Sequence, residues 1–332
     1  MSAVHLLNVG PGDCTVIQHA SGRVSLLDIC CANAQRTHAR VSMAKIFESV
    51  AAGGNFRMCD SKEQPLDYLQ RLGVSRIWRF ILSHPDMDHM DGLAALLDNI
   101  SVQHFWDSGV RRAAPDFAPG SPYLQADWDA YEALISGSGS SMGAPVQTLE
   151  VLAGNRFSFA NEPPDSHDGI YILAPDKSLR DQASASEDVN DGSYALLYRS
   201  NGGRIVLPGD AYDDTWRHVI DTYRTDVAGC AFLLAPHHGR DSARSYEYLD
   251  VLRPALTLIG CAPSEHINYH AWYDRGLDFI TSNQAGNVVL HTDNGRLNVF
   301  IENRKFAAKY VDVDSTPKDA LGHYFIGSIS DR

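Results

Sequence analysis

The feature that most constrains this chain is a group of potential metal ligands that directly follows an apolar run. Residues 77–82 (Ile-Trp-Arg-Phe-Ile-Leu) are typical of a buried strand. The next residues carry four side chains that offer nitrogen or oxygen to a divalent metal, namely His84, Asp86, Asp88 and His89. On a continuing strand His84 and His89 would face opposite sides, so we expect the strand to end in a turn where these side chains converge. A solvated polar turn with an aspartate capping the next helix is the alternative interpretation.

Two runs of predicted strands, each accompanied by helices, organise the chain. In the first half we expect strands at 4–9, 14–17, 24–29 and 77–82, and helices at 41–50, 65–72 and 92–97. In the second half we expect strands at 146–152, 156–160, 169–174, 194–199, 204–208, 230–235, 255–260, 286–292 and 297–301, and helices at 213–224 and 243–252. This pattern predicts an α+β fold, a four-layer αββα sandwich, in which a single domain consists of two halves at about 1–145 and 146–332.

Residues 107–144 interrupt the pattern. They contain several prolines and the tract 136–141 (Ser-Gly-Ser-Gly-Ser-Ser), which is flexible by composition. We therefore interpret this segment as an insertion or a lid-like connection.

Composition limits the functional classes. Lys and Arg number 28 against 41 Asp and Glu, so a formal net charge of −13 makes the general surface repel polyanions, although a bound metal and local arginines can reverse the sign inside a cleft. No stretch approaches the ~18 apolar residues of a membrane span, and the first residues lack the basic start of a signal peptide. The six cysteines include no Cys-x-x-Cys pair, so we expect buried reduced thiols in a cytoplasmic protein without a membrane segment.

The sequence Ser-His-Pro-Asp-Met-Asp-His at 83–89 resembles the His-x-His-x-Asp-His signature of the metallo-β-lactamase superfamily, with Asp86 in place of the second histidine. Other stretches are similar to the branch that contains the hydrolase domain of the ComEC/Rec2 competence proteins, in order and approximate spacing. These stretches are residues 9–13, 72–74, 190–193, 207–210 and 234–239. The resemblance implies an αββα fold and metal-dependent hydrolysis, and it does not include residues 107–144 or the end of the chain.

Two later strand ends supply further candidate ligands. Asp210 follows an apolar strand and a Pro-Gly turn, so its carboxylate is expected at the sheet edge as a bridge between two metals, with an ordinary turn aspartate as the alternative. His237 and His238 follow the apolar run 231–234. Because adjacent side chains diverge, we expect His237 to bind metal. His238 would contact substrate or act as an acid, and a purely structural role for it is equally open.

The resemblance implies one more ligand after the paired histidines. We choose His270, and His266 stays open because the Gly and Pro that flank this histidine in the family are absent. The superfamily's other common histidine ligand, between the first cluster and Asp210, has no convincing equivalent. The first metal site would then be rich in oxygen ligands.

Other side chains are expected around the metal centre. Asp13 and Asp28 resemble residues that hydrogen-bond the ligands and orient their loop, and stabilisation of turns is the alternative for both. Arg240, with Ser242 beside it at an expected helix start, can clamp a phosphate bidentately, although it can equally be a solvated arginine. Asn190 lies in a stretch that matches the family and is a further candidate for substrate contact.

These features predict a hydrolase that activates water on one or two divalent ions. Aspartate at position 86 moves the preference from Zn²⁺ toward Mn²⁺ or Mg²⁺, although geometry and availability also decide. Asp88 would orient the attacking water or bind a second metal. The resemblance makes a phosphodiester the leading substrate and DNA the specific guess. Hydrolysis of a carboxylic ester, lactone or amide, and a catalytically weak binding or regulatory module, are the alternatives.

Overall fold

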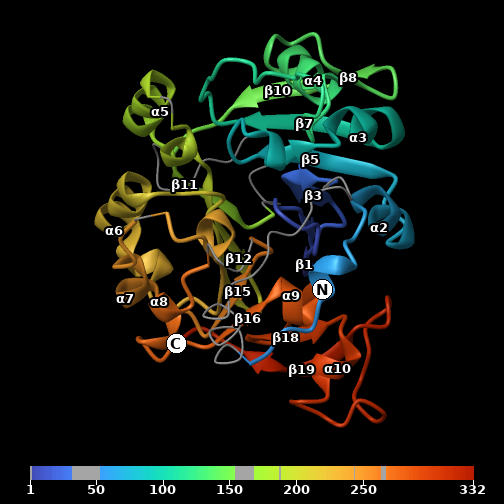
Figure 1. Ribbon diagram of the computed structural model, residues 1–332, viewed down its shortest axis with the longest axis vertical. Coiled ribbons are helices and arrows are strands. Elements are labelled where there is room, and N and C mark those ends of the chain that lie inside the picture. Colours follow the sequence, from blue (N-terminus) through green and yellow to red (C-terminus); the bar gives the residue numbers. More distant parts are fainter. Residues whose placement is uncertain (1, 32–52, 154–167, 187, 243, 263–266) are drawn as a thin grey trace.

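Two β-sheets packed face to face form the centre of the protein (Figure 1), as seen in a computed structural model that describes residues 2–31, 53–153, 168–186, 188–242, 244–262 and 267–332. In the described residues, the first sheet consists, in spatial order, of β10 (Gln147–Glu150), β7 (Ser101–Asp107), β5 (Arg76–Leu82), β3 (Val24–Leu27), β2 (Thr15–Gln18), β1 (Ala3–Leu6), β17 (Val288–Asp293), β18 (Arg296–Ile301) and β19 (Tyr324–Ile329). The second consists of β11 (Ile170–Ala174), β12 (Ala195–Ser200), β13 (Gly203–Leu207), β14 (Phe232–Leu234), β15 (Leu256–Ile259) and β16 (Phe279–Thr281).

Side chains alternate between an inner and an outer core along each central strand. In β5, Ile81 points into the core between the two sheets, whereas Phe80 points to the outer face of the first sheet. In β14, Phe232 faces the inner core and Leu233 the outer face of the second sheet. Because successive residues of a strand point to opposite faces, a strand covered on both sides is apolar throughout.

Helices cover both outer faces. The first sheet is covered by α2 (Pro65–Arg71), α3 (Leu93–Asn99) and α4 (Gln125–Ile135), and the second by α6 (Asp213–Val227), α7 (Tyr248–Leu252) and α8 (His270–Tyr273). Figure 1 shows the two groups of helices on opposite sides of the molecule. The αββα sandwich predicted from the sequence is therefore confirmed. Among the helices of the described residues, none has the length and the apolar composition needed to cross a bilayer.

The predicted elements differ from the observed ones in several places. Most expected strands are present with shifted ends, but β7, β16 and β19 were not expected, and neither were α4 and α5 (Lys177–Ala185). The helix predicted at 243–252 spans only Tyr248–Leu252. The helix predicted at 41–50 and the strand predicted at 156–160 lie outside the described residues.

Residues 107–144 are not a loose connection throughout. Helix α4 lies within them, contacts α3, and buries Tyr131 in the outer core of the first sheet. In the Ser-Gly tract, Ser141 is buried and its Oγ donates a hydrogen bond to the carbonyl of Ile100 at 2.5 Å. Tertiary packing therefore orders Ser141, in a tract (136–141) whose composition alone is flexible.

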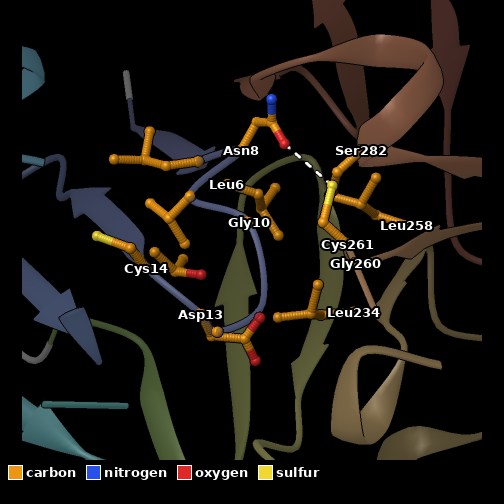
Figure 2. A pocket seen from close by; sticks show the side chains of 14 residues that line it. Leu6, Asn8, Gly10, Asp13, Cys14, Leu234, Leu258, Gly260, Cys261 and Ser282 are labelled. Atoms are coloured by element: carbon orange, nitrogen blue, oxygen red, sulfur yellow. Dashed lines mark hydrogen bonds between the residues drawn. The ribbon is translucent and has the colours of Figure 1, made fainter. Parts of the chain in front are cut away.

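Two of the cysteines form a disulfide. Cys59 lies in η1 (Met58–Asp60) and is bonded to Cys261, which follows β15. The two cysteines are 202 positions apart in the sequence. Cys261 lies at the wall of a small pocket beside the first turn of the chain (Figure 2). Cys14, Cys30, Cys31 and Cys230 are reduced thiols. The expectation of reduced cysteines is therefore wrong for the bonded pair. The sequence could not predict this bond, because only the fold brings the Cα atoms of two such distant cysteines to 6.4 Å from each other.

Candidate metal centre

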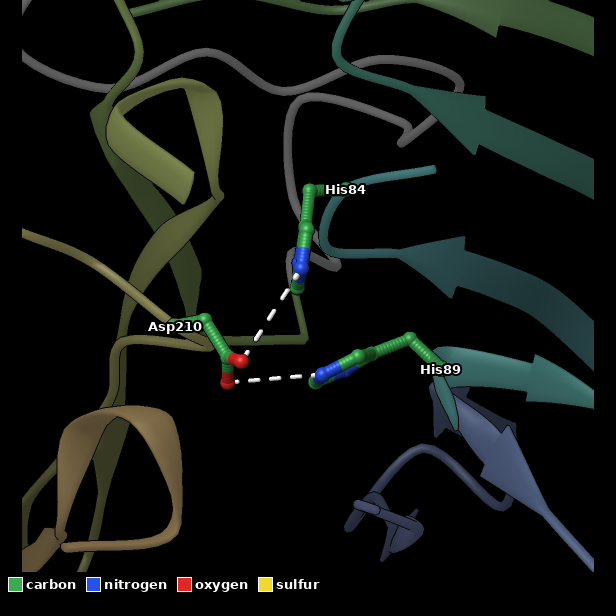
Figure 3. Close-up of side chains that lie close together, drawn as sticks. All are labelled: His84, His89 and Asp210. Carbon is green, nitrogen blue, oxygen red and sulfur yellow. Dashed lines mark ion pairs between the residues drawn. The ribbon is translucent and has the colours of Figure 1, made fainter. Parts of the chain in front are cut away.

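Strand ends from both sheets meet at one edge of the sandwich. In the first sheet β5 runs parallel to β3 and β7, and in the second β13 runs parallel to β14. The loop after β5 carries His84 and His89, and the turn after β13 carries Asp210. Both imidazoles point toward the Asp210 carboxylate (Figure 3), with Nε2 to Oδ distances of 4.0 Å for His84 and 3.3 Å for His89. Residues more than a hundred positions apart in the sequence thus meet here.

Asp28 holds the loop after β5 in place. Its Oδ1 accepts a hydrogen bond from the backbone N–H of Ser83 at 2.7 Å, and its Oδ2 accepts one from Nδ1 of His89 at 2.8 Å. Asp28 has φ +57°, a left-handed conformation that costs a residue other than glycine about 1–3 kcal/mol. On the other side of the loop, a Cβ on Gly12 would lie 2.4 Å from the backbone oxygen of Asp88, so glycine is required for this close approach.

The two remaining carboxylates of the loop face different histidines. Asp86 Oδ2 lies 3.5 Å from Nε2 of His84, and Asp88 Oδ2 lies 3.8 Å from Nε2 of His238. Both aspartates are partly exposed, whereas both histidines are buried. These two carboxylates therefore lie at the solvent side of the centre, and His84 and His238 lie on its interior side.

Both histidines after β14 reach Asp210. They lie in η4 (Pro236–Gly239), and their Nε2 atoms are 3.6 Å (His237) and 3.7 Å (His238) from Asp210 Oδ2. Adjacent side chains were expected to diverge, but φ values of +50° and +56° turn both rings toward the same carboxylate. The His238 side chain is only 1% exposed and its Nδ1 donates to Asp13 Oδ1 at 3.2 Å, whereas the His237 side chain is 13% exposed.

The donor set fits a divalent metal. Nε2 of His84, His89 and His238 and Oδ1 of Asp210 are buried, and none of these atoms has a hydrogen-bond partner among the described residues. Ligand atoms about 2.1 Å from one tetrahedral ion lie about 3.4 Å apart, which is close to the separations found here. Within the part of the chain that the structure describes, four overlapping groups bring ligand atoms within 4.8 Å of one another: His84, His89 and Asp210; Asp88, His89 and His238; Asp13, Asp210 and His238; and Asp13, Asp28 and His89. These residues can hold a metal ion.

Burial and neighbouring carboxylates act in opposite directions on the imidazoles. At His84 burial dominates and lowers the pKa to about 4. At His89 the carboxylates of Asp210 and Asp28 outweigh burial and hold the pKa well above its ordinary value. Asp210 and Asp13 likewise raise the pKa of His238. Burial would raise the pKa of Asp210, but His89 and His238 hold it well below the ordinary value of an aspartate.

A group of basic and hydroxyl side chains borders the centre at its solvent side. Of the predicted residues, Ser242 Oγ lies 3.0 Å from Nδ1 of His237, and Arg240 follows η4 with an Nε that has no partner among the described residues. Arg244 was not among the predicted site residues, yet its Nη2 lies 2.6 Å from Nδ1 of His237. Burial, opposed by Asp210 and aided by the two arginines, lowers the pKa of His237 to about 3.

Two residues at the centre were missed entirely. Tyr212 places its hydroxyl 3.1 Å from Nδ1 of His237, and Arg112 forms an ion pair with Asp86. Arg112 lies in the segment interpreted as an insertion, where no periodicity pointed to it. Tyr212 follows Asp210 by two positions, and this short distance along the chain is the only signal that could have identified it.

Not every predicted residue joins the centre. His270 lies on α8 with a side chain that is 66% exposed, and its Nδ1 faces Asp274 at 3.8 Å. The structure therefore does not bring His270 to the ligand cluster, because the short helix α8 turns it toward solvent. The alternative, His266, lies outside the described residues. Asn190 lies in η3 (Asn190–Gly192), and its buried Oδ1 has no partner among the described residues.

Comparisons with known proteins concern the fold alone. No protein family model and no curated protein matches the chain. Igni18, a metallo hydrolase from the hyperthermophilic archaeon Ignicoccus hospitalis KIN4/I, is similar with a TM-score of 0.45 and 12% identity over 88% of this chain and 100% of that one. A diphosphatase from the PhnP family has a TM-score of 0.43 and 10% identity over 89% and 99%. CmlA, a diiron β-hydroxylase from Streptomyces venezuelae, has a TM-score of 0.41 and 12% identity over 87% and 54%.

Proposed function

We propose that this chain is a hydrolase that uses one or two divalent metal ions to cleave phosphodiesters, with DNA as the leading substrate. The observation that carries the proposal is the convergence of buried, unpartnered Nε2 atoms on the carboxylate of Asp210. Such atoms are costly to bury without a partner, and a cation supplies one.

Each residue of the centre has a role in this proposal. His84, Asp86 and Asp210 would hold one ion. Asp88, His89 and one of the paired histidines after β14 would hold a second, with Asp210 shared. A divalent ion bound there supplies Lewis acidity and lowers the pKa of a bound water toward neutral pH. Asp88 is partly exposed and can accept a hydrogen bond from the attacking water.

The substrate class is inferred from the charges beside the centre. Arg240 lies beside His237 with an Nε that has no partner among the described residues. Arg112 forms an ion pair with the partly exposed Asp86. Guanidinium groups bind phosphate oxygens with paired hydrogen bonds, whereas a neutral ester or lactone has no comparable use for them. A net charge of −13 disfavours broad contact with a polyanion, so recognition would be local.

Hydrolysis by the purified chain tests the proposal. Single-stranded DNA, duplex DNA, bis-nitrophenyl phosphate and nitrophenyl acetate would each be assayed with Mn²⁺, Mg²⁺ and Zn²⁺. We expect cleavage of the phosphodiesters, and its loss in His84→Ala and Asp86→Ala but not in the exposed control His270→Ala. Equal cleavage by the wild type and both centre variants would refute the proposed site, and cleavage of the acetate alone would refute the substrate class.

A further inference from the structure

The histidines of the centre differ in what their Nδ1 atoms contact. In three of them Nδ1 faces an oxygen that can accept a hydrogen bond: Asp28 Oδ2 at 2.8 Å for His89, Asp13 Oδ1 at 3.2 Å for His238, and Ser83 Oγ at 3.0 Å for His84. A carboxylate only accepts hydrogen bonds, and a serine hydroxyl can accept one. In the neutral rings of His89 and His238 the proton is therefore on Nδ1, and Nε2 presents a lone pair. The serine contact of His84 is compatible with the same tautomer. Histidines that bind metals share this arrangement, because the outer partner fixes the tautomer.

His237 has the opposite arrangement. Its Nδ1 lies 2.6 Å from Nη2 of Arg244. A guanidinium has donors only, so Nδ1 of His237 must accept this hydrogen bond. The hydroxyls of Tyr212 and Ser242, at 3.1 Å and 3.0 Å, can donate to the same atom. The proton of the neutral ring is then on Nε2, which has no lone pair to offer a cation.

Arg244 is firmly held in this position. The residue is buried, its Nη1 donates to the carbonyl of Ala211 at 2.9 Å, and its guanidinium carbon lies 4.3 Å from the centre of the Tyr212 ring. These contacts come from the turn that carries Asp210 and do not depend on His237. Because the donor is fixed from outside, the tautomer of His237 is fixed as well.

We propose that His238, and not His237, is the metal ligand of the paired histidines, and that Arg244 holds His237 as a neutral Nε2–H donor for an anionic substrate oxygen. The nature of that oxygen rests on the proposed function, since a phosphodiester presents such oxygens beside the metals. The more exposed position of His237 agrees with substrate contact, and the burial of His238 agrees with a ligand. Arg244 is a positioning residue that acts through His237. This assignment reverses the one made from the sequence.

Metal binding without substrate separates the two histidines. Zn²⁺ alone would be titrated into the purified chain by calorimetry, with metal content checked by elemental analysis. In His237→Gln the side-chain amide keeps an N–H donor at the position of Nε2, and we expect the affinity to change by less than about 3-fold. In His238→Gln we expect a loss larger than the roughly 10- to 100-fold that removal of an outer partner causes. The reverse order of effects would overturn the proposal.

The tautomer itself can be observed in the unmodified chain. Two-bond ¹H–¹⁵N correlation spectra of protein labelled at histidine distinguish protonated from unprotonated ring nitrogens, and sequential assignment of the unmodified chain identifies the ring of His237. We expect an unprotonated Nδ1 and a protonated Nε2 for His237, unchanged on addition of Zn²⁺. A protonated Nδ1 would overturn the proposal without any variant, so a variant that fails to fold does not leave it undecided.

The two proposals fail in different ways. If the wild-type chain binds no divalent ion, the proposed function fails. If it binds Zn²⁺ and cleaves phosphodiesters but loses the metal in His237→Gln, only the assignment of the histidines fails. For Arg244→Gln we expect metal content close to that of the wild type and a raised KM, together with a changed His237 tautomer. An unchanged tautomer would overturn the role of Arg244.

Discussion

The two sides of the centre differ in charge. We call Asp13, Asp28, Asp88 and Asp210 the acidic wall, and we call Arg240 and Arg244 the basic rim. The acidic wall surrounds histidines whose pKa is raised, namely His89 and His238. The basic rim lies against His237, whose pKa is lowered to about 3. Neighbouring residues of one turn, His237 and His238, thus belong to opposite electrostatic environments.

This difference shows how one edge of the sandwich can present two environments of opposite charge side by side. Carboxylates at short distance attract a cation, and guanidinium groups a few ångströms away attract an anion, provided that the two sets do not neutralise each other. Here Arg244 is held by a carbonyl and an aromatic ring and donates to His237 rather than to a carboxylate. The overall charge of −13 therefore says little about the ligand that the rim would bind.

Removal of the shared carboxylate is the strongest way to break the acidic wall. In Asp210→Asn we expect Zn²⁺ affinity to fall by more than about 100-fold, because the Asp210 carboxylate lies near Nε2 of His84, His89 and His238. Loss of a residue that only orients a ligand lowers metal affinity by at most about 100-fold. Calorimetric titration measures the affinity. Asp214→Asn, on the exposed Asp214–Arg217 pair, is the matched control and should bind as the wild type does. Equal affinity in both variants would contradict the wall as a metal site.

A smaller effect is expected from the residues that orient the ligands. Asp28→Asn weakens the hydrogen bond to Nδ1 of His89 and should lower Zn²⁺ affinity by roughly 10- to 100-fold. Asparagine tolerates the left-handed backbone at this position, so the loop should keep its conformation. Asp13→Asn should act in the same way through His238. Affinity as in the wild type in both variants would show that these aspartates only stabilise turns.

The basic rim is expected to affect substrate and not metal. Loss of one charged hydrogen bond in Arg240→Ala should raise KM for bis-nitrophenyl phosphate by about 10-fold, or about 1.4 kcal/mol, with Zn²⁺ affinity unchanged. Steady-state kinetics and calorimetry measure the two quantities separately. Arg217→Ala removes an exposed arginine on α6 and serves as control. A loss of metal affinity in Arg240→Ala would remove the distinction between wall and rim.

His5 is buried away from the acidic wall, so the pH dependence of stability can show what burial does to a histidine without those carboxylates. Burial lowers the pKa of His5 from 6.5 to about 4, and its ring nitrogens contact Tyr68 and Gln18. The unfolded chain therefore binds more protons, and stability is lost as the pH falls below 6.5 toward 4. Between pH 7 and pH 6 His5 should contribute a loss of about 0.7 kcal/mol.

Urea unfolding at the two pH values measures this loss. His5→Gln should show a correspondingly smaller pH dependence of the free energy of unfolding, while the exposed control His270→Gln should behave as the wild type does. The same pH dependence in all three proteins would show that His5 is not the titrating group.

The sequence predicted site residues that lie close together along the chain better than contacts between distant residues. His84 to His89 lie on one short loop after a strand, so their proximity followed from the sequence. The choice between His237 and His238 depended on left-handed backbone and on Arg244, which no pattern of residue types reveals. His270 was chosen from a resemblance, and the turn of α8 places it in solvent.

Packing partners explain the other differences. In α4, Trp128, Tyr131 and Leu134 contact the first sheet, but prolines and a Ser-Gly tract on either side hid this pattern. Strand β19 lies at the edge of the first sheet and pairs with β18. Its conformation therefore depends on that pairing, which the local sequence does not show. Such elements follow from tertiary contacts more than from their own sequence.

The bond between Cys59 and Cys261 joins the N-terminal half of the chain to the C-terminal half. A protease that cuts the backbone once at any point between these two residues would leave both fragments attached to each other. The nicked protein would migrate as one species in a denaturing gel until a reducing agent is added, and as two species afterwards. An incision in the loop that carries Arg112 would therefore not release either sheet from the other.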